Sequence, residues 1–199
     1  MITIGVLDLQ GAVIEHINKI NEIEGVSALK VKNLEDLSKV QGIILPGGES
    51  TVIGKLLRDL NILDTLREKI KEGLPVWGTC AGMILLAKKI EGYDYNHIGT
   101  MDIEVKRNAY GAQVDSFITE EIIEGVSNEK IPMIFIRAPY VERVLGDVEV
   151  LCKVKGNIVA CREKNMLATS FHPELSKDLT MHRYFHKMCS QHMESNLTL

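Results

Sequence analysis

Short continuous apolar runs alternate with runs of helical periodicity along the first part of the chain. Residues 2–7, 26–31 and 42–45 are continuous runs rich in Ile, Val and Leu, which predicts buried strands. Between the first two runs, apolar residues recur at helical spacing, which predicts a helix that follows the turn at residues 9–11 and ends at Gly25. Its expected apolar face consists of Val13, Ile14, Ile17, Ile20 and Ile23.

The same alternation continues to about residue 89. Residues 34–40 predict a short helix. Ser50 or Thr51 is expected to cap the next helix, whose apolar residues are Val52, Ile53, Leu56, Leu57 and Leu60. A further helical stretch ends at Gly73, and a short apolar run then leads into a helix that reaches about residue 89. Strands and helices that alternate in this way predict a mainly parallel sheet covered by helices on both faces.

The pattern changes from about residue 98, where strand candidates follow one another with only turns between them. These candidates are residues 103–105, 114–117, 133–136, 148–154, 158–160 and 167–171. We expect them to extend the same sheet in antiparallel fashion, with a last helix over residues 179–192 and a frayed tail over residues 194–199. The prediction is one three-layer α/β domain over residues 1–199.

Composition and charge narrow the class of protein. The 199 residues are 45% hydrophobic and 25% charged, which is ordinary for a globular protein, and the formal charge of −4 argues against nucleic-acid binding. No apolar run approaches the roughly 18 residues of a membrane span. The four cysteines form no Cys-x-x-Cys pair and the N-terminus lacks a basic leader, so we expect reduced thiols in the cytoplasm.

The first chemical signal is Gly78-Thr79-Cys80-Ala81-Gly82, which joins a predicted strand to a predicted helix. Gly-x-Cys-x-Gly at such a junction is the pattern of a nucleophile elbow with a thiol in place of a hydroxyl. The turn is sharp, so the flanking residues must be small, and the helix N-terminus favours a thiolate. The alternative is a buried structural cysteine beside packing glycines.

A base for this thiol is available at the end of the last predicted strand, in Ser170-Phe171-His172-Pro173-Glu174. His172 and Glu174 are two residues apart and can approach one another in extended backbone, which gives a triad of Cys, His and Glu. His-Pro-Glu alone would be interpreted as a capping histidine before a solvated glutamate. The cysteine elbow in the same chain favours the catalytic interpretation.

The third signal is Pro46-Gly47-Gly48-Glu49-Ser50, which follows a strand. Acyl transfer needs two donors to the oxyanion, and we expect one from the Ala81 N–H and the other from the Gly47-Gly48 loop. A phosphate-binding loop is the competing interpretation, because Gly54-Lys55 follows. It fails because Glu49 occupies the position of the first glycine and Leu56 replaces the Ser or Thr that holds Mg²⁺.

A metal site is a weaker candidate. His182 and His186 are one helical turn apart, with Cys189 and His192 close in sequence, but no second ligand pair is evident. A solvated helix face is the better interpretation.

The three motifs at 46–50, 78–82 and 170–174 resemble those of class I (triad) glutamine amidotransferases. Further blocks resemble the family of glutaminase subunits of pyridoxal 5'-phosphate synthase: residues 5–7 with 9–11, Arg107-Asn108 with 113–117, and residues 135–139. The resemblance implies a flavodoxin-like three-layer fold and hydrolysis of glutamine through a γ-glutamyl thioester. It also implies that ammonia passes to a synthase subunit in a hetero-oligomer, with no cofactor and no metal in this subunit.

The resemblance also implies roles for individual residues. Cys80 would be the nucleophile, His172 the base and Glu174 its orienting acceptor. The implied glutamine contacts are Gly47, Gly48, Glu49, Arg107, Ile136 and Arg137. The implied partner contact lies at Gln10 and Gly11.

Two positions depart from the family pattern: Asp8, where a small or apolar residue is expected, and Ala112, where a basic residue is common. Three other functions stay open on the sequence: a stand-alone γ-glutamyl hydrolase, a non-catalytic regulatory module, and a glutaminase that serves another synthase.

Overall fold

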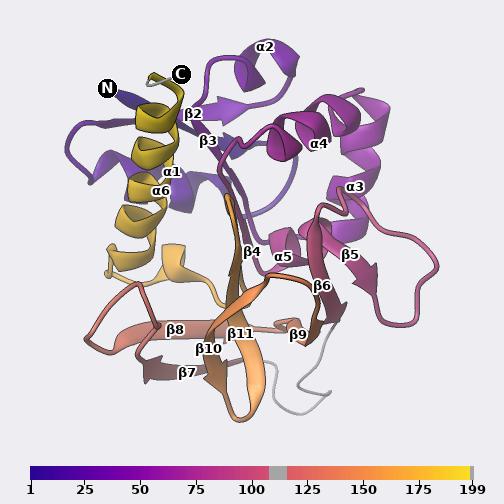
Figure 1. Cartoon of the computed structure of the whole chain (residues 1–199), viewed down its shortest axis with the longest axis vertical. Helices are drawn as coiled ribbons and strands as arrows, with labels where there is room; N and C mark the ends of the chain where they lie inside the picture. Colours follow the sequence, from indigo (N-terminus) through magenta and orange to yellow (C-terminus); the bar gives the residue numbers. More distant parts are fainter. Residues whose placement is uncertain (108–115, 198–199) are drawn as a thin grey trace.

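A ten-stranded sheet forms the centre of the molecule (Figure 1). The computed structural model describes residues 1–107 and 116–197. The strand order is β2-β1-β3-β4-β12-β11-β9-β6-β5, with β10 paired to β11, and β7 and β8 form a separate two-stranded sheet. The strands are β1 (Ile2–Leu7), β2 (Val26–Val31), β3 (Gly42–Leu45), β4 (Val76–Thr79), β5 (Ala87–Ile90), β6 (Met101–Lys106), β7 (Ser116–Glu121), β8 (Ile131–Ile136), β9 (Tyr140–Val144), β10 (Glu149–Val154), β11 (Asn157–Glu163) and β12 (Met166–Thr169).

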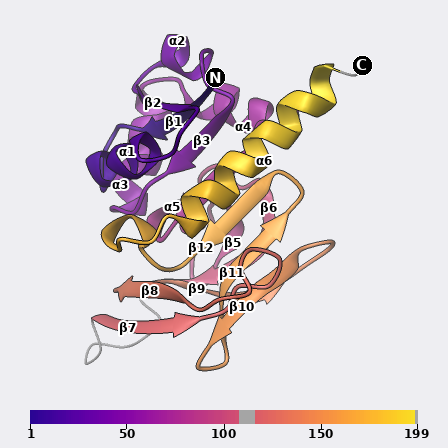
Figure 2. The same cartoon turned by 90° about the vertical axis from the view of Figure 1, so that its left-hand side faces the viewer.

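Helices cover both faces of the sheet, as Figures 1 and 2 show. The helices are α1 (Val13–Asn21), α2 (Leu34–Leu37), α3 (Ser50–Asp59), α4 (Leu63–Lys71), α5 (Ala81–Leu86), α6 (Thr180–Leu197) and the 3-10 turn η1 (Pro173–Leu175). Apolar residues of α2, α3, α4 and α5 pack in one core cluster, and those of α1 and α6 pack in the other. The strands alternate between the two clusters: Ile44 faces α1 and α6, whereas Ile43 and Leu45 face the opposite layer.

The three-layer α/β prediction is confirmed, and the strands at 2–7, 26–31 and 42–45 have the predicted bounds. The predicted antiparallel extension is also present, because β12 pairs antiparallel with β11, and β9 pairs antiparallel with both β11 and β6. It is not wholly antiparallel, since β5 and β6 run parallel. The candidate at 133–136 and the described part of the candidate at 114–117 do not extend this sheet, because they lie in β8 and β7, which pair only with each other in the described residues.

Several predicted boundaries are wrong. The helix after Cys80 ends at Leu86, and β5 follows at once, because its backbone pairs with β6 and this pairing overrides the helical preference of the local sequence. The helix predicted over residues 34–40 ends at Leu37, and β9 was not predicted at all. Helix α3 begins at Ser50 after Glu49, without the side-chain cap expected from Ser50 or Thr51.

The end of the chain also differs from the prediction. Helix α6 continues to Leu197, so residues 194–197 are helical and not a frayed tail. None of the helices in the described part of the chain has both the length and the apolar character needed to cross a membrane.

Sheet topology brings the candidate site together. Strands β3, β4 and β12 are parallel neighbours, with Leu45 opposite Gly78 and Thr79 opposite Thr169. The loops that follow these strands therefore leave the same edge of the sheet, and they carry the three sequence motifs. Strand β1 pairs parallel with β3, so the segment that contains Gln10 leaves the same edge.

Candidate active site

Cys80 occupies a strained turn between β4 and α5. Its φ of 49° and ψ of −104° lie where non-glycine residues are rare. The turn is held by two backbone hydrogen bonds, from Cys80 N–H to Thr169 O at 2.8 Å and from Met83 N–H to Cys80 O at 3.1 Å. A Cβ on Gly78 would collide with the backbone of Gly82, as the small-neighbour argument requires.

His172 and Glu174 meet beside this turn. The His172 Nδ1 atom lies 2.7 Å from Glu174 Oε1, and both side chains are largely buried. Because Nδ1 is taken by the carboxylate, Nε2 is the ring nitrogen left for the thiol. The backbone fixes the turn as well, since His172 N–H donates to Ile134 O at 2.8 Å.

The charge state of His172 follows from its neighbours. Burial alone would lower its pKa, but hydrogen bonds to Cys80 and Glu174 and the charge of Glu174 outweigh burial and raise the pKa to about 10. The imidazole is therefore protonated at neutral pH. A protonated imidazole between a thiol and a carboxylate has a proton to give to a leaving group.

The Gly47-Gly48 loop packs directly against the pair of Cys80 and His172. A Cβ on Gly47 would lie 2.5 Å from His172 Cε1 and 3.4 Å from Cys80 Cβ. The Gly47 carbonyl accepts a hydrogen bond from Ala12 N–H at 2.9 Å, so it turns toward the segment before α1. Since the peptide is trans, the Gly48 N–H points away from that segment.

The segment before α1 also makes a hydrogen bond with Glu49, the residue that follows Gly48 in this loop. Gln10 Oε1 accepts a hydrogen bond from Glu49 N–H at 2.8 Å. Gln10 and Gly11 are themselves exposed. The candidate partner contact thus touches the candidate oxyanion loop directly.

Arg107 and Glu49 form an ion pair at the border of the site. Arg107 Nη2 lies 3.0 Å from Glu49 Oε1, and its guanidinium carbon lies 5.3 Å from the centroid of the Tyr93 ring. Ile136 and Arg137 follow one another at the end of β8 and are exposed, and Arg137 has a positive φ of 43°. The structure therefore brings Arg107 to Glu49, and it places Ile136 and Arg137 at the end of the strand whose Ile134 holds His172.

The two departures from the family pattern have different outcomes. Asp8 Oδ2 lies 3.3 Å from Lys32 Nζ, so the unusual carboxylate has a partner at the end of β2. Ala112 lies outside the described residues, as do Asn108 and residues 113–115 of the resembling block.

A group of buried polar residues behind Glu174 was missed in the sequence. His16 on α1 and His182 on α6 are almost completely buried, and His16 Nε2 lies 3.5 Å from Glu174 Oε2. The predicted solvated face of the last helix is therefore wrong for His182, because this side of α6 packs against α1 and β4. The available signal was spacing, since Val13, His16 and Ile20 share the buried stripe of α1.

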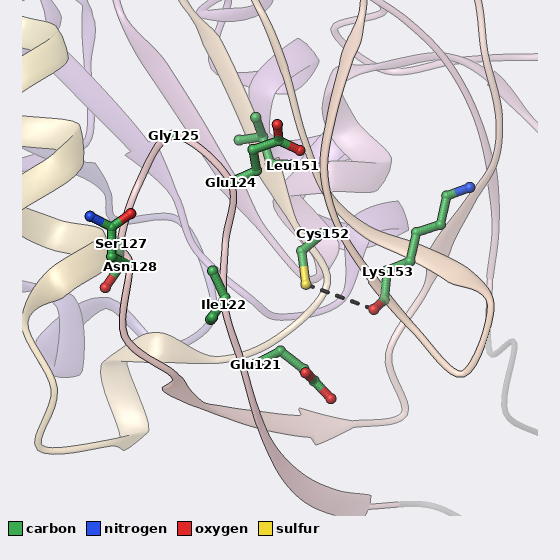
Figure 3. Close-up of a pocket in the computed structure, with 9 residues that line it drawn as sticks. All are labelled: Glu121, Ile122, Glu124, Gly125, Ser127, Asn128, Leu151, Cys152 and Lys153. Carbon is green, nitrogen blue, oxygen red and sulfur yellow. Dashed lines mark hydrogen bonds between the residues drawn. The ribbon is translucent and has the colours of Figure 1, made fainter.

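A pocket elsewhere in the molecule differs from the candidate site in its chemistry. Figure 3 shows its lining residues, which are Glu121, Ile122, Glu124, Gly125, Ser127, Asn128, Leu151, Cys152 and Lys153. Burial, together with the charge of Glu121, raises the pKa of the Cys152 thiol to about 11, so this thiol is protonated at neutral pH. No three or more His, Cys, Asp and Glu side chains in the described residues form a group that could hold a metal ion.

Comparison with solved structures defines the class. A protein solved under the description "Crystal structure of glutamine amidotransferase" superposes with a TM-score of 0.88 and is 42% identical, over 94% of this chain and 98% of that one. A putative GMP synthase protein from Thermoplasma acidophilum shares the fold, with a TM-score of 0.70 at 18% identity over 98% of each chain. The fold is that of the class I glutamine amidotransferases.

Sequence comparison then gives the family. The model of the SNO glutamine amidotransferase family matches residues 6–191, and the chain belongs to this family. A relative from Clostridium botulinum named "Pyridoxal 5'-phosphate synthase subunit PdxT" is 58% identical over 93% of this chain and 96% of its own length. A protein of the same name from Streptococcus pneumoniae is 54% identical over 94% of this chain and 97% of its own length.

Proposed function

We propose that this chain hydrolyses L-glutamine to L-glutamate and ammonia as the glutaminase subunit of a pyridoxal 5'-phosphate synthase. The observation that best supports the reaction is the junction of β4 and α5, where the strained Cys80 lies beside an imidazole held by Glu174 at 2.7 Å. Membership of the SNO family and the names of the relatives support the role in the synthase.

The first half of the proposed reaction forms a thioester. The Cys80 thiolate attacks the side-chain amide carbon of glutamine, and the N–H groups of Ala81 and Gly48 stabilise the oxyanion. His172 donates its proton to the departing amide nitrogen, so ammonia leaves and a γ-glutamyl thioester remains on Cys80. The Gly47 carbonyl is turned toward Ala12, so the N–H on the opposite side of the same peptide, that of Gly48, is the one assigned to the oxyanion.

The second half releases glutamate. The now neutral His172 takes a proton from water, which attacks the thioester carbonyl and restores the thiolate. The sum is glutamine and water converted to glutamate and ammonia. Thiolate, imidazole and backbone donors supply the nucleophile, the proton transfers and the oxyanion site, so this subunit needs no cofactor for the reaction.

Recognition of glutamine is assigned to the rest of the site. An arginine binds a carboxylate through two parallel hydrogen bonds, so Arg107 and Arg137 are assigned to the α-carboxylate. Glu49, which now pairs with Arg107, is assigned to the α-ammonium group. The Gly47-Gly48 loop and Ile136 complete the contacts.

The synthase subunit is assigned to the exposed Gln10-Gly11 segment, because Gln10 accepts a hydrogen bond from Glu49 N–H and the following residue, Ala12, donates one to the Gly47 carbonyl. Ammonia that reached water would be protonated and lost as a nucleophile, which favours a sheltered transfer to a partner. A hetero-oligomer in the cytoplasm fits these requirements, and the four unpaired cysteines support a reducing compartment.

The deciding experiment measures glutamate and ammonia release by the purified chain, alone and with the synthase subunit. We expect the rate to rise at least about tenfold with the synthase, because its assigned contact at Gln10 also holds the loop that carries the second oxyanion donor. One correctly placed donor is worth about 10²–10³ in rate. Full activity of the isolated chain, above all on γ-glutamyl peptides, would favour a stand-alone hydrolase. Capture of a different synthase from native extract, identified by mass, would assign the glutaminase to that enzyme instead.

A further inference from the structure

We propose that His16 is a positioning residue of the glutaminase site, whose Nε2–H holds the second carboxylate oxygen of Glu174. His182 would select the tautomer of His16 that makes this possible. The inference rests on the proposed function, since it concerns how Glu174 serves His172.

The carboxylate of Glu174 is only half satisfied by the triad. Its side chain is completely buried, and Oε1 takes the 2.7 Å contact with His172 Nδ1. The other oxygen, Oε2, has no hydrogen bond in the described part of the chain. His16 Nε2 lies 3.5 Å from this oxygen. A buried carboxylate oxygen without a donor is costly, so this approach needs an explanation.

The second nitrogen of His16 decides what the first can do. His16 Nδ1 lies 3.0 Å from His182 Nε2, so one of these two atoms donates and the other accepts. If His16 donated, its Nε2 would present a lone pair to the carboxylate, and the His182 Nδ1–H would be buried without an acceptor. If His182 donates, His16 Nε2 carries a proton toward Glu174 and only a lone pair on His182 is left unpaired. The second arrangement avoids both penalties.

Both histidines act as neutral donors. Burial lowers the pKa of His16 well below its usual value, and the nearby His182 and His172 lower it further. Burial and the charge of Lys19 lower the pKa of His182 to about 3. The contact between His16 and Glu174 is therefore an N–H facing a carboxylate, and not an ion pair.

A simple core-filling role does not account for the two rings. His16 and His182 pack against Trp77 with centroid distances of 5.7 and 5.0 Å, and Phe185 fills the next position around the same indole with an apolar ring. An apolar residue thus suits this environment. The carboxylate explains the two imidazoles: His16 lies beside Oε2 of Glu174, and His182 contacts the other ring nitrogen of His16.

His16 has its largest effect after the first proton transfer. While His172 is protonated, its positive charge balances the negative charge of the Glu174 carboxylate. Once His172 has given its proton to ammonia, the carboxylate loses this cation, and the His16 N–H is the remaining donor on its other oxygen. Thr79 Oγ1, at 3.3 Å from His16 Nε2, shares the donor, but a charged acceptor makes the stronger hydrogen bond.

The test compares His16→Gln with His16→Asn in the full chain, assayed with the synthase subunit. The Gln amide nitrogen reaches the place of Nε2, whereas the shorter Asn cannot. We expect His16→Gln to keep kcat within about threefold of the parent and His16→Asn to lose about tenfold, with KM for glutamine unchanged in both. In a Glu174→Gln background the His16→Asn loss should shrink to about twofold, because His16 acts through that carboxylate.

The matched control is His186→Leu. His186 lies one turn after His182 on α6, and its replacement should leave kcat unchanged. Equal kcat for folded His16→Gln and His16→Asn, or an undiminished loss in the Glu174→Gln background, would overturn the inference. The rate of Cys80 alkylation by iodoacetamide gives a readout without glutamine, and it should fall several-fold in His16→Asn but not in His16→Gln. If the parent released no glutamate, the proposed function would fail while this alkylation comparison still decided the role of His16.

Discussion

Cys80 and Cys152 are buried to a similar degree, at 9% and 7% exposed, yet their surroundings are chemically opposite. Cys80 follows a strand at the carboxyl edge of the parallel region, beside an imidazole whose pKa is about 10. Cys152 lies within the antiparallel region, in the pocket of Figure 3, where burial and the charge of Glu121 raise its pKa to about 11. Burial alone therefore does not distinguish a nucleophile from a structural thiol; the neighbouring base does.

The difference has a topological cause. Parallel neighbours end at the same edge, so β3, β4 and β12 deliver a glycine loop, a cysteine and a histidine to one place. In an antiparallel pair such as β10 and β11, neighbouring strands end at opposite edges. Cys152 lies inside β10, and its thiol contacts only the carbonyl of Lys153 among the hydrogen-bond acceptors described, at 3.9 Å.

Replacing the two cysteines should produce the largest difference between the regions. Cys80→Ala should lower glutamine hydrolysis by at least about 10³-fold with the fold intact, because the nucleophile is lost and its side chain is not needed for packing. Cys152→Ala should leave kcat within about twofold. The measurement is ammonia release with the synthase subunit, with circular dichroism as the folding control. Activity of folded Cys80→Ala above about 1% of the parent rate would remove Cys80 as the nucleophile.

A matched pair of glycines should give the next largest difference. Gly47→Ala places a Cβ 2.5 Å from the His172 ring, so we expect kcat to fall about 100-fold as the ring or the oxyanion loop shifts. Gly125, in the pocket of Figure 3, has nothing within 4 Å of the corresponding position. Its φ of 73° means that Gly125→Ala should cost about 1–2 kcal/mol of stability without affecting kcat.

Thermal unfolding and steady-state kinetics of both glycine variants decide this prediction. Equal kcat values for Gly47→Ala and Gly125→Ala would show that the close packing of Gly47 against His172 has no role in the reaction.

The parallel region was predictable because its periodicity is local. Residues 2–7, 26–31 and 42–45 have the predicted strand bounds, since continuous apolar runs between helices are typical of strands buried on both faces. The strand β5 was missed because Ala87–Ile90 continues an apparent helix, and only the distant β6 makes it a strand. Tyr140–Val144 was missed because its charged residues Glu142 and Arg143 hide the apolar pattern.

The candidate site shows the same limit. Cys80, His172 and Glu174 were found because each lies in a short motif with a chemical meaning. His16 and His182 were not connected with them, because their meeting depends on how α1 and α6 pack over β4 and η1. The buried stripe of α1 reveals that His16 is inside, but no sequence pattern shows that it faces Glu174.

The last prediction concerns stability and not the rate, and it separates the two regions by pH. His172 has a folded pKa of about 10, above the 6.5 of an unfolded histidine, so the stability that it contributes is full below pH 6.5 and is lost as the pH rises toward 10. The raised pKa of Cys152 affects stability at higher pH. An unfolded thiol loses its proton near pH 9 and the folded thiol near pH 11, so the stability that Cys152 contributes is lost only above pH 9. Each group lowers the unfolding free energy by at most about 1.4 kcal/mol per pH unit within its window.

Urea unfolding at pH 6.5, 9 and 11 tests this. The decrease in unfolding free energy between pH 6.5 and 9 should be absent in His172→Asn, and the decrease between pH 9 and 11 should be reduced in Cys152→Ala. A His172→Asn protein that lost as much stability as the parent between the first two of these pH values would show that His172 is not held as a cation by Glu174.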